Sequence, residues 1–210
     1  ARWRQPPPGV WVLTQQTATD ERDIEISFEA GVPVALDGQK MGLVELINSL
    51  GSVVGSYSWG RIDMVENRRV GIKSRETYEC PASLALILAH NDLESITLER
   101  DLAREKARLE PRYAELIYDG LWFSPLKRAY DAFIEDSQRF VTGDVRLHLS
   151  PGSCRVTGRR SPDALYDYEL ATYDAADTFR HADSEGFVRL WGLSVQTWAS
   201  RQGPGRGQNK

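Results

Sequence analysis

The sequence predicts an α+β fold, with a mixed or antiparallel sheet made of hairpins packed against several helices. Apolar and polar residues alternate with period two on both sides of Gly31, and again on both sides of Pro151-Gly152. Alternation that is broken by glycine or proline is typical of a β-hairpin. Between these two regions, residues 41–54 and 83–118 carry apolar side chains at helical spacing.

Length and composition favour one substantial domain. The 210 residues are 41% hydrophobic and 27% charged, which is ordinary for a globular protein. A net charge of −4 argues against binding to nucleic acid or to an anionic membrane. No apolar run reaches the eighteen or so residues of a spanning helix, and no signal-type segment opens the chain, so we expect a soluble, cytoplasmic protein. Cys80 and Cys154 are too few and too far apart for a disulfide framework or a zinc site, and no metal site is predicted.

Residues 1–22 are predicted to form an extended connector. The run Pro6-Pro7-Pro8-Gly9 favours polyproline geometry and lacks backbone donors. We expect this segment to be weakly ordered and to cross to a preceding domain, with Trp3 and Trp11 anchoring it to the body.

The first predicted hairpin spans residues 23–38, and a helix follows it. Its strands place apolar residues at every second position, and Asp37-Gly38 closes the second strand. Residues 41–54 then form an amphipathic helix that covers one face of the sheet and ends at Gly55.

The most unusual stretch is residues 60–82, which hold four acids, five bases and one tyrosine with little helical periodicity. If residues 61–65 are extended, Glu66 falls at the end of a strand. Gly71 and Pro81 constrain the backbone on either side of what we interpret as a loop. Loops held by a rigid scaffold concentrate binding groups, and this one offers the carboxylate of Glu66 and the phenol of Tyr78.

Helices and a second hairpin are predicted in the next part of the chain. We expect one or two helices in residues 83–118, with a break at Pro111, and another helix from Ser124-Pro125 to Val141. His90 is interpreted as a structural, hydrogen-bonded residue, because no partner for acid-base work is evident. The second hairpin lies in residues 145–157.

The last quarter of the chain combines polar and apolar segments. We interpret a basic group on the second hairpin as a solvated strand face, formed by Arg155, Arg159 and Arg160. Residues 161–165 should form a short helical turn, and three tyrosines should pack on the sheet, namely Tyr166, Tyr168 and Tyr173. A loop is expected to run to Gly186, followed by a buried apolar segment in residues 187–198 and a disordered tail in residues 201–210.

Residues 60–81 match a long pattern, G-R-x-D-x-V-E-N-R-x-x-G-x-K-S-R-x-x-Y-E-x-P, at every fixed position. Two later stretches match shorter patterns, A-E-L-x-Y-x-G-x-W-x-x-P from Ala114 and G-R-x-S from Gly158, and residues 23–38 match the hairpin that precedes the long pattern. The chain thereby resembles argininosuccinate synthase, which joins citrulline to aspartate using ATP. The resemblance covers about nine tenths of the chain, and a pattern of this length is far more specific than a short fingerprint.

The resemblance implies that the chain is only the second half of such an enzyme. No S-G-G run and no other phosphate-binding glycine motif occurs in it, so the nucleotide-binding half and two citrulline-contacting serines are expected to be missing. The implied domains are a connector (1–22), a synthetase domain on the citrulline side (23–186) and a C-terminal oligomerisation arm with its tail (187–210). The arm resembles one that crosses to another subunit of a homotetramer.

The resemblance also implies a mechanism in two steps. The ureido oxygen of citrulline attacks the α-phosphorus of ATP, which carries Mg²⁺, and the amine of aspartate then displaces AMP. Glu66 and Tyr78 match residues that bind citrulline, and neither is expected to exchange protons. Four further residues are candidates for supporting the loop, namely Arg61, Lys73, Ser74 and Arg75. No residue of the chain is predicted to be catalytic by itself.

Alternative interpretations remain open. The chain could be a non-catalytic subunit for oligomerisation and substrate holding, or a degenerate relative that binds an amino acid as a regulator. Tyr57-Ser58-Trp59 and Cys80 depart from the usual pattern beside the site and should affect its affinity. Alone, the chain is expected to be inactive, because nothing in it resembles an ATP cradle. Truncation, proteolysis and gene architecture are all compatible with the absence of the other half.

Overall fold

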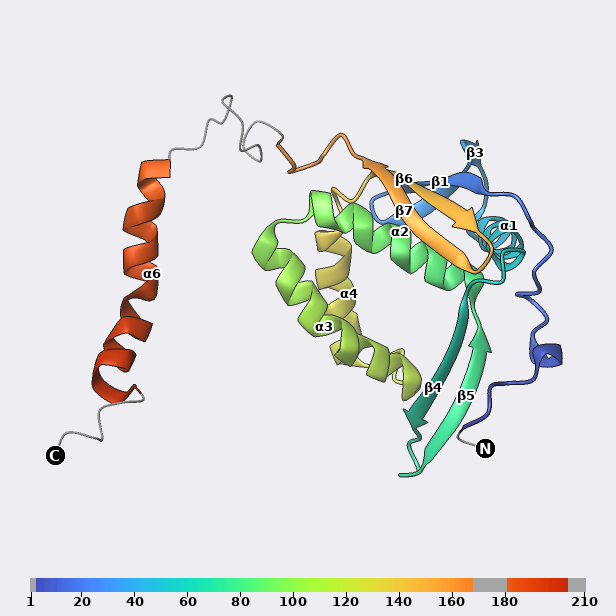
Figure 1. The fold of residues 1–210 in the computed structure, drawn as a ribbon, viewed down its shortest axis with the longest axis horizontal. Helices are drawn as coiled ribbons and strands as arrows, with labels where there is room; N and C mark the ends of the chain where they lie inside the picture. Colours follow the sequence, from blue (N-terminus) through green and yellow to red (C-terminus); the bar gives the residue numbers. More distant parts are fainter. Residues whose placement is uncertain (1–2, 168–180, 204–210) are drawn as a thin grey trace. The chain divides into compact units, whose positions relative to one another are not determined.

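A computed structural model describes residues 3–167 and 181–203, and it confirms the α+β class (Figure 1). Residues 1–166 form one compact unit and residues 167–210 a second one. The described helices are η1 (Pro8–Val10), α1 (Leu43–Gly55), α2 (Pro81–Thr97), α3 (Arg100–Tyr118), α4 (Pro125–Ser137) and α6 (His181–Gln202). The described strands are β1 (Arg22–Glu29), β2 (Val32–Leu36), β3 (Gln39–Lys40), β4 (Arg61–Asn67), β5 (Lys73–Glu79), β6 (Gly143–Ser150) and β7 (Ser153–Arg160).

Both predicted hairpins are present and join in one sheet. The strand order is β3-β2-β1-β6-β7, and every pairing is antiparallel. β1 lies at the centre, where Ile24 is opposite Leu147 and Ile26 is opposite Val145. All four side chains are almost fully buried, because side chains two positions apart point to the same face of a strand. The alternation in the sequence therefore records the buried face of this sheet.

α1 and α2 cover that face and complete the core. Leu46, Leu50 and Val54 lie at helical spacing along α1 and are fully buried. α2 contributes Ala85, Ala89 and Leu93, of which the two alanines let the helix approach β6 and β7 closely. Burial of these side chains is the main stabilising term of the domain, at about 25 cal/mol for each Å² of apolar surface removed from water.

The boundary between α2 and α3 lies at residues 98–99, so the predicted break at Pro111 is wrong. Leu98 has an extended backbone, and the Glu99 side chain caps α3 by accepting hydrogen bonds from the backbone N–H groups of Asp101 (2.8 Å) and Leu102 (3.1 Å). Pro111 lies inside α3. The cap satisfies donors at the true boundary, whereas the proline removes a single N–H from the helix interior. α4 is also shorter than predicted and ends at Ser137.

The N-terminal segment is attached to the body rather than weakly ordered. The backbone N–H groups of Thr17 and Ala18 donate to the carbonyl of Ser56, at 2.9 and 3.0 Å. Trp11 lies under the guanidinium of Arg61, 4.7 Å from the ring centre, as an anchor would. Trp3 is fully exposed, so its predicted anchoring role is wrong.

Several predictions after residue 158 need correction. Residues 161–165 form a non-helical turn instead of the predicted helical turn. The backbone N–H of Leu165 donates to the carbonyl of Ile96 (2.7 Å) and holds this turn against the end of α2. Tyr166 is exposed and does not pack on the sheet, while Tyr168 and Tyr173 lie outside the described residues. On β7, Arg160 forms an ion pair with Asp144 (2.7 Å).

α6 is described by itself, as part of the second unit. It begins at His181, before the predicted loop end at Gly186, and it continues through Gln202 into the segment predicted to be disordered. Its apolar side chains, which include Phe187, Trp191 and Trp198, are exposed in the single chain. Residues 204–210 lie outside the described part of the chain. None of the described helices combines the length and apolar character that crossing a membrane requires.

Candidate functional site

The charged stretch of residues 60–82 folds as a two-stranded ribbon, made of β4 and β5, that extends from the body (Figure 1). The predicted loop beyond Glu66 is therefore wrong, because residues 73–79 form a second strand. The strands are joined by a tight turn in which the N–H of Arg68 donates to the carbonyl of Ile72 (2.9 Å) and Gly71 has a φ of 84°. Only glycine adopts this angle without steric cost. β5 is polar and shows no alternation of apolar residues, so the sequence did not indicate that residues 73–79 form a strand.

Strand alternation divides the candidate residues between two faces of the ribbon. The first face carries Ile62, Met64 and Glu66 from β4, and Ser74, Glu76 and Tyr78 from β5. The second face carries Arg61, Asp63, Val65 and Asn67 from β4, and Lys73, Arg75, Thr77 and Glu79 from β5. The residues predicted to bind a ligand thus share one face, and the basic residues predicted to support them share the other.

On the first face, Glu66 and Tyr78 are joined directly. The Tyr78 hydroxyl donates to Oε2 of Glu66 at 3.1 Å, and 43% of Tyr78 is exposed. This hydrogen bond raises the pKa of Tyr78 above the usual value, with smaller contributions from burial and from the negative charges of Glu66 and Glu76. The pair therefore presents a neutral phenol and a carboxylate that still has acceptor capacity for an N–H group.

Ser74 lies directly opposite Glu66 in the strand register. Its hydroxyl oxygen is buried and has no hydrogen-bond partner within the described part of the chain. Buried polar atoms are nearly always paired, so an unpaired one beside a carboxylate is notable. Ser74 was predicted only as a supporting residue, and its position adds a third polar group to the first face.

On the second face, Arg75 and Lys73 are occupied by internal contacts. The Arg75 guanidinium forms a bidentate hydrogen bond with Asp63, in which Nε lies 2.7 Å from Oδ1, and it also donates to the carbonyl of Arg4 (2.9 Å). The hydrogen bond to Arg75 holds the pKa of Asp63 below its usual range, and the same contact raises the pKa of Arg75. Lys73 donates to Asn67 at 2.6 Å. These contacts fix the ribbon and tie it to the N-terminal segment.

Glu79 and Thr14 form an anchor that was not singled out from the sequence. The Glu79 carboxylate accepts hydrogen bonds from the backbone N–H groups of Val12 (2.8 Å), Leu13 (3.0 Å) and Thr14 (2.8 Å), and from the Thr14 hydroxyl (2.5 Å). Arg61, opposite Glu79 in the register, donates to the Thr14 hydroxyl at 2.7 Å. Partial burial raises the pKa of Glu79, but these four hydrogen bonds outweigh it and hold the pKa below its usual value. The only signal in the sequence was that Glu79 occupies a fixed position of the long pattern.

The ribbon also contacts the corner between α3 and α4. Arg69, in the ribbon turn, forms an ion pair with Asp119 just after α3, and the Asp119 side chain is only 9% exposed. Tyr118, the last residue of α3, adds a small electrostatic contribution to the raised pKa of Tyr78. The ion pair places the turn of the ribbon beside the end of α3.

Together, these features define the class as an α+β domain whose candidate site is a polar ribbon presenting a carboxylate, a phenol and a hydroxyl on one face. The site offers hydrogen-bond donors and acceptors, and the sequence contains no phosphate-binding glycine motif. Residues 1–198 match the family described as arginosuccinate synthase C-terminal domain, and the chain belongs to that family.

Curated relatives agree with this assignment. The chain is 54% identical over 199 residues to the argininosuccinate synthase of Rubrobacter xylanophilus, with 93% of the chain and 49% of the relative covered. It is 50% identical over 202 residues to that of Trichodesmium erythraeum, covering 95% of the chain and 50% of the relative. It is 52% identical over 199 residues to that of Synechococcus sp. (strain JA-2-3B'a(2-13)), covering 93% and 50%. The chain spans about half the length of the curated relatives it matches.

Proposed function

We propose that this chain acts as the C-terminal part of an argininosuccinate synthase. The assembled enzyme would condense L-citrulline and L-aspartate with ATP and release argininosuccinate, AMP and pyrophosphate, a ligase reaction of arginine biosynthesis in the cytoplasm. The observation that carries the proposal is the Glu66–Tyr78 pair, which lies on one face of the ribbon within the longest pattern shared with the family.

In this proposal, Glu66 and Tyr78 position citrulline. The Glu66 carboxylate accepts an N–H of the ureido or ammonium group, and the phenol of Tyr78 donates or accepts beside it. An acceptor on a ureido N–H leaves more electron density on the conjugated ureido oxygen, which would favour its attack on the α-phosphorus of ATP. Neither residue has to exchange a proton, because alignment and charge stabilisation lower the barrier.

Arg61, Lys73 and Arg75 support the site in this proposal rather than touch the substrate. Each already has a partner within the fold, since Arg61 donates to Thr14, Lys73 donates to Asn67 and Arg75 pairs with the carboxylate of Asp63. ATP, its Mg²⁺ and aspartate are proposed to be held mainly by the half of the enzyme that this chain does not match. The chain alone is then inactive.

α6 supplies the second part of the proposal. Its exposed face holds Phe187, Leu190, Trp191 and Trp198, an apolar content that is unusual for a surface helix. We infer that this helix is the arm that contacts other copies of the chain in a homotetramer. The same observation favours the alternative function, in which the chain is a non-catalytic subunit for oligomerisation and substrate holding.

The test is citrulline-dependent release of pyrophosphate from ATP. The chain would be assayed alone and mixed with the half of the Rubrobacter xylanophilus relative that it does not match, with Glu66→Gln and Tyr78→Phe as variants. Activity is expected only in the mixture and is expected to fall in both variants. A silent mixture in which the chain still assembles into oligomers would favour the non-catalytic role instead. Citrulline bound by the chain alone, without any activity in the mixture, would point to the amino-acid-binding regulator.

A further inference from the structure

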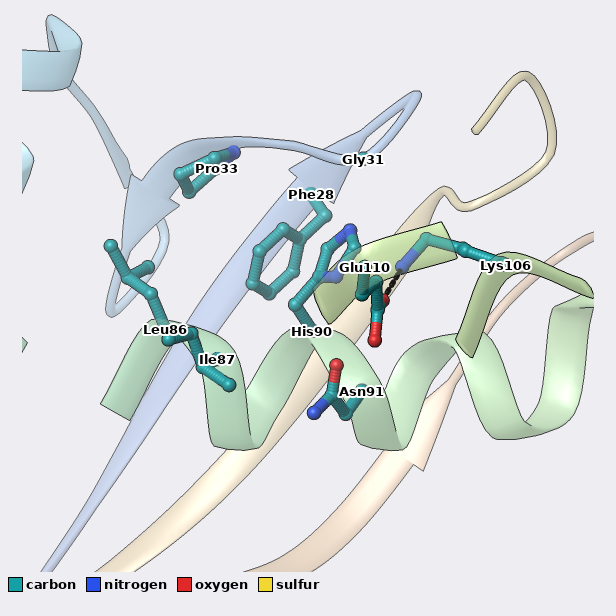
Figure 2. A pocket seen from close by; sticks show the side chains of 9 residues that line it. All are labelled: Phe28, Gly31, Pro33, Leu86, Ile87, His90, Asn91, Lys106 and Glu110. Carbon is teal, nitrogen blue, oxygen red and sulfur yellow. Dashed lines mark hydrogen bonds and ion pairs between the residues drawn. The ribbon is translucent and has the colours of Figure 1, made fainter. Parts of the chain in front are cut away.

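A cavity lies away from the ribbon, between the β1–β2 turn and the helices α2 and α3. Its volume is about 450 Å³, and none of its lining residues belongs to β4 or β5. One wall is apolar and consists of Phe28, Pro33, Leu86 and Ile87. The other is polar and carries His90, Asn91, Lys106 and Glu110 (Figure 2). A mixed lining of this kind is typical of small-molecule sites.

The cavity continues into a neighbouring one of about 590 Å³. The two share Gly31, His90, Lys106 and Glu110, and the second adds Glu135 and Gln138. Gly31 makes this junction possible, because a Cβ there would lie 2.5 Å from Oε1 of Gln138 and the backbone has a φ of 78°. We refer to the two cavities together as the Lys106 groove.

A buried ionic network forms the floor of the Lys106 groove. The ammonium of Lys106, whose side chain is 9% exposed, lies 3.1 Å from the carboxylate of Glu94 and donates to Glu110. Figure 2 shows the Lys106 ammonium turned toward Glu110, with the second Glu110 oxygen turned away from it. Burial lowers the pKa of Lys106, but the two carboxylates outweigh it and raise the pKa, so the ammonium is charged at neutral pH.

Gln138 and His90 extend this network along the floor of the groove. The amide nitrogen of Gln138 donates to Glu94 at 2.7 Å, which leaves its oxygen 2.8 Å from Nε2 of His90. Because an amide oxygen only accepts, this network places an N–H group of His90 at Nε2. Nδ1 of His90 lies 3.7 Å from Oε1 of Glu94.

The charges of the groove do not balance. Glu94, Glu110 and Glu135 are carboxylates, and Lys106 is the only lysine or arginine among the residues that line the two cavities or belong to the network. Glu94 is satisfied by Lys106 and Gln138, but the Glu110 side chain is 49% exposed and Glu135 makes no ion pair in the described part of the chain. An anion in the groove would be repelled by the carboxylates of Glu110 and Glu135. A cation would find in them hydrogen-bond acceptors that are still available, beside an apolar wall.

We propose that the Lys106 groove binds a small organic cation, with a primary ammonium or guanidinium group at Glu110 and Glu135 and a compact apolar body against Phe28, Leu86 and Ile87. The bound cation balances the excess negative charge of the groove, and its apolar body covers side chains such as Ile87, which is 55% exposed. This site is separate from the citrulline site, and it does not depend on the catalytic role of the chain.

The probe is phenethylamine, titrated into the full chain by calorimetry and by two-dimensional NMR, with 2-phenylethanol as its neutral counterpart. The amine is expected to bind about tenfold more tightly than the alcohol, because it adds one charge-assisted hydrogen bond. Glu110→Gln should weaken amine binding about tenfold and leave alcohol binding unchanged. Glu105→Gln, on the same helix and paired with Arg108 at the surface, is the matched control and should change neither.

Glu135→Gln is a second variant and keeps the test decisive if Glu110→Gln unfolds, which circular dichroism would reveal. It should weaken amine binding about threefold, as an exposed charge does. The proposal is overturned if amine and alcohol bind equally, or if amine binding survives both substitutions. It is also overturned if amine binding disappears as the chain associates at higher concentration, since a second copy would then fill the groove.

Discussion

Replacing Glu79 by glutamine should loosen the attachment of the N-terminal segment to the ribbon. In the native chain, Oε1 of Glu79 accepts from Leu13, from the Thr14 backbone and from the Thr14 hydroxyl, and Oε2 accepts from Val12. Glutamine keeps one oxygen for the first three donors, but its NH₂ group would face the N–H of Val12. One hydrogen bond is lost, and three lose their ionic character.

The cost follows from the difference between charged and neutral hydrogen bonds. A hydrogen bond to a charged group contributes about 1.5–3 kcal/mol and a neutral one about 0.5–1.5 kcal/mol, so one lost bond and three weakened bonds give about 4–5 kcal/mol at the low end of these ranges. Glu79 is only partly buried, and solvent halves this figure to about 2 kcal/mol. For a unit of this size, that corresponds to a fall in Tm of about 4–8 °C.

The assay is thermal unfolding followed by circular dichroism between pH 7 and pH 3. Because the pKa of Glu79 is lowered in the folded chain, its contribution is present above the ordinary glutamate pKa of about 4.3 and is lost as the pH falls through the folded value. The gap between the native chain and Glu79→Gln should therefore close below about pH 4. The exposed Glu105→Gln should shift Tm by less than about 2 °C at any pH. An equal Tm for the native chain and Glu79→Gln at pH 7 would refute this reasoning.

Three further predictions concern single groups. In the native chain, the pKa of Asp63, followed by NMR of its carboxyl carbon, should lie below the usual aspartate range. In Arg75→Lys, which cannot form the bidentate contact, this pKa should return toward that range. An unchanged pKa in the variant would contradict the pairing. Lys106→Met should destabilise the fold by about 3 kcal/mol in urea unfolding, because the buried carboxylate of Glu94 loses its partner, and a loss below about 1 kcal/mol would show that Glu94 is solvated. Burial raises the pKa of Cys154 to about 11, so at pH 8 its thiol should react with a disulfide reagent only on unfolding, and rapid labelling in the native state would contradict that burial.

The parts of the fold that the sequence predicted are those in which burial dictates the residue pattern. Ile24, Ile26 and Phe28 alternate because one face of β1 is core, and Leu46 and Leu50 lie on the face of α1 that covers it. The same reasoning failed where burial is absent. β5 reads K-S-R-E-T-Y-E and has no apolar face, so only its pairing with β4 identifies it as a strand.

The boundary after α2 and the N-terminal anchor depend on contacts that a sequence does not display. The side chain of Glu99 caps the N-terminus of α3 and so fixes where this helix begins, although glutamate is not a favoured capping residue. Glu79 captures backbone donors from residues more than sixty positions away. For the candidate site, the motif match identified Glu66 and Tyr78, but only the strand register placed them on a different face from Arg75.

The most direct measurement of the central proposal is the KM for citrulline of the assembled enzyme carrying Tyr78→Phe, compared with Thr77→Val. Tyr78 lies on the face with Glu66, whereas Thr77 is its exposed neighbour on the opposite face of the same strand. If the first face of the ribbon holds citrulline, Tyr78→Phe should raise the KM for citrulline about tenfold, as the loss of one hydrogen bond to a charged or strongly polar group does. The KM for ATP should stay unchanged, and Thr77→Val should leave both values unchanged. Equal citrulline KM values in Tyr78→Phe, Thr77→Val and the native enzyme would contradict the assignment of the ribbon as the citrulline site.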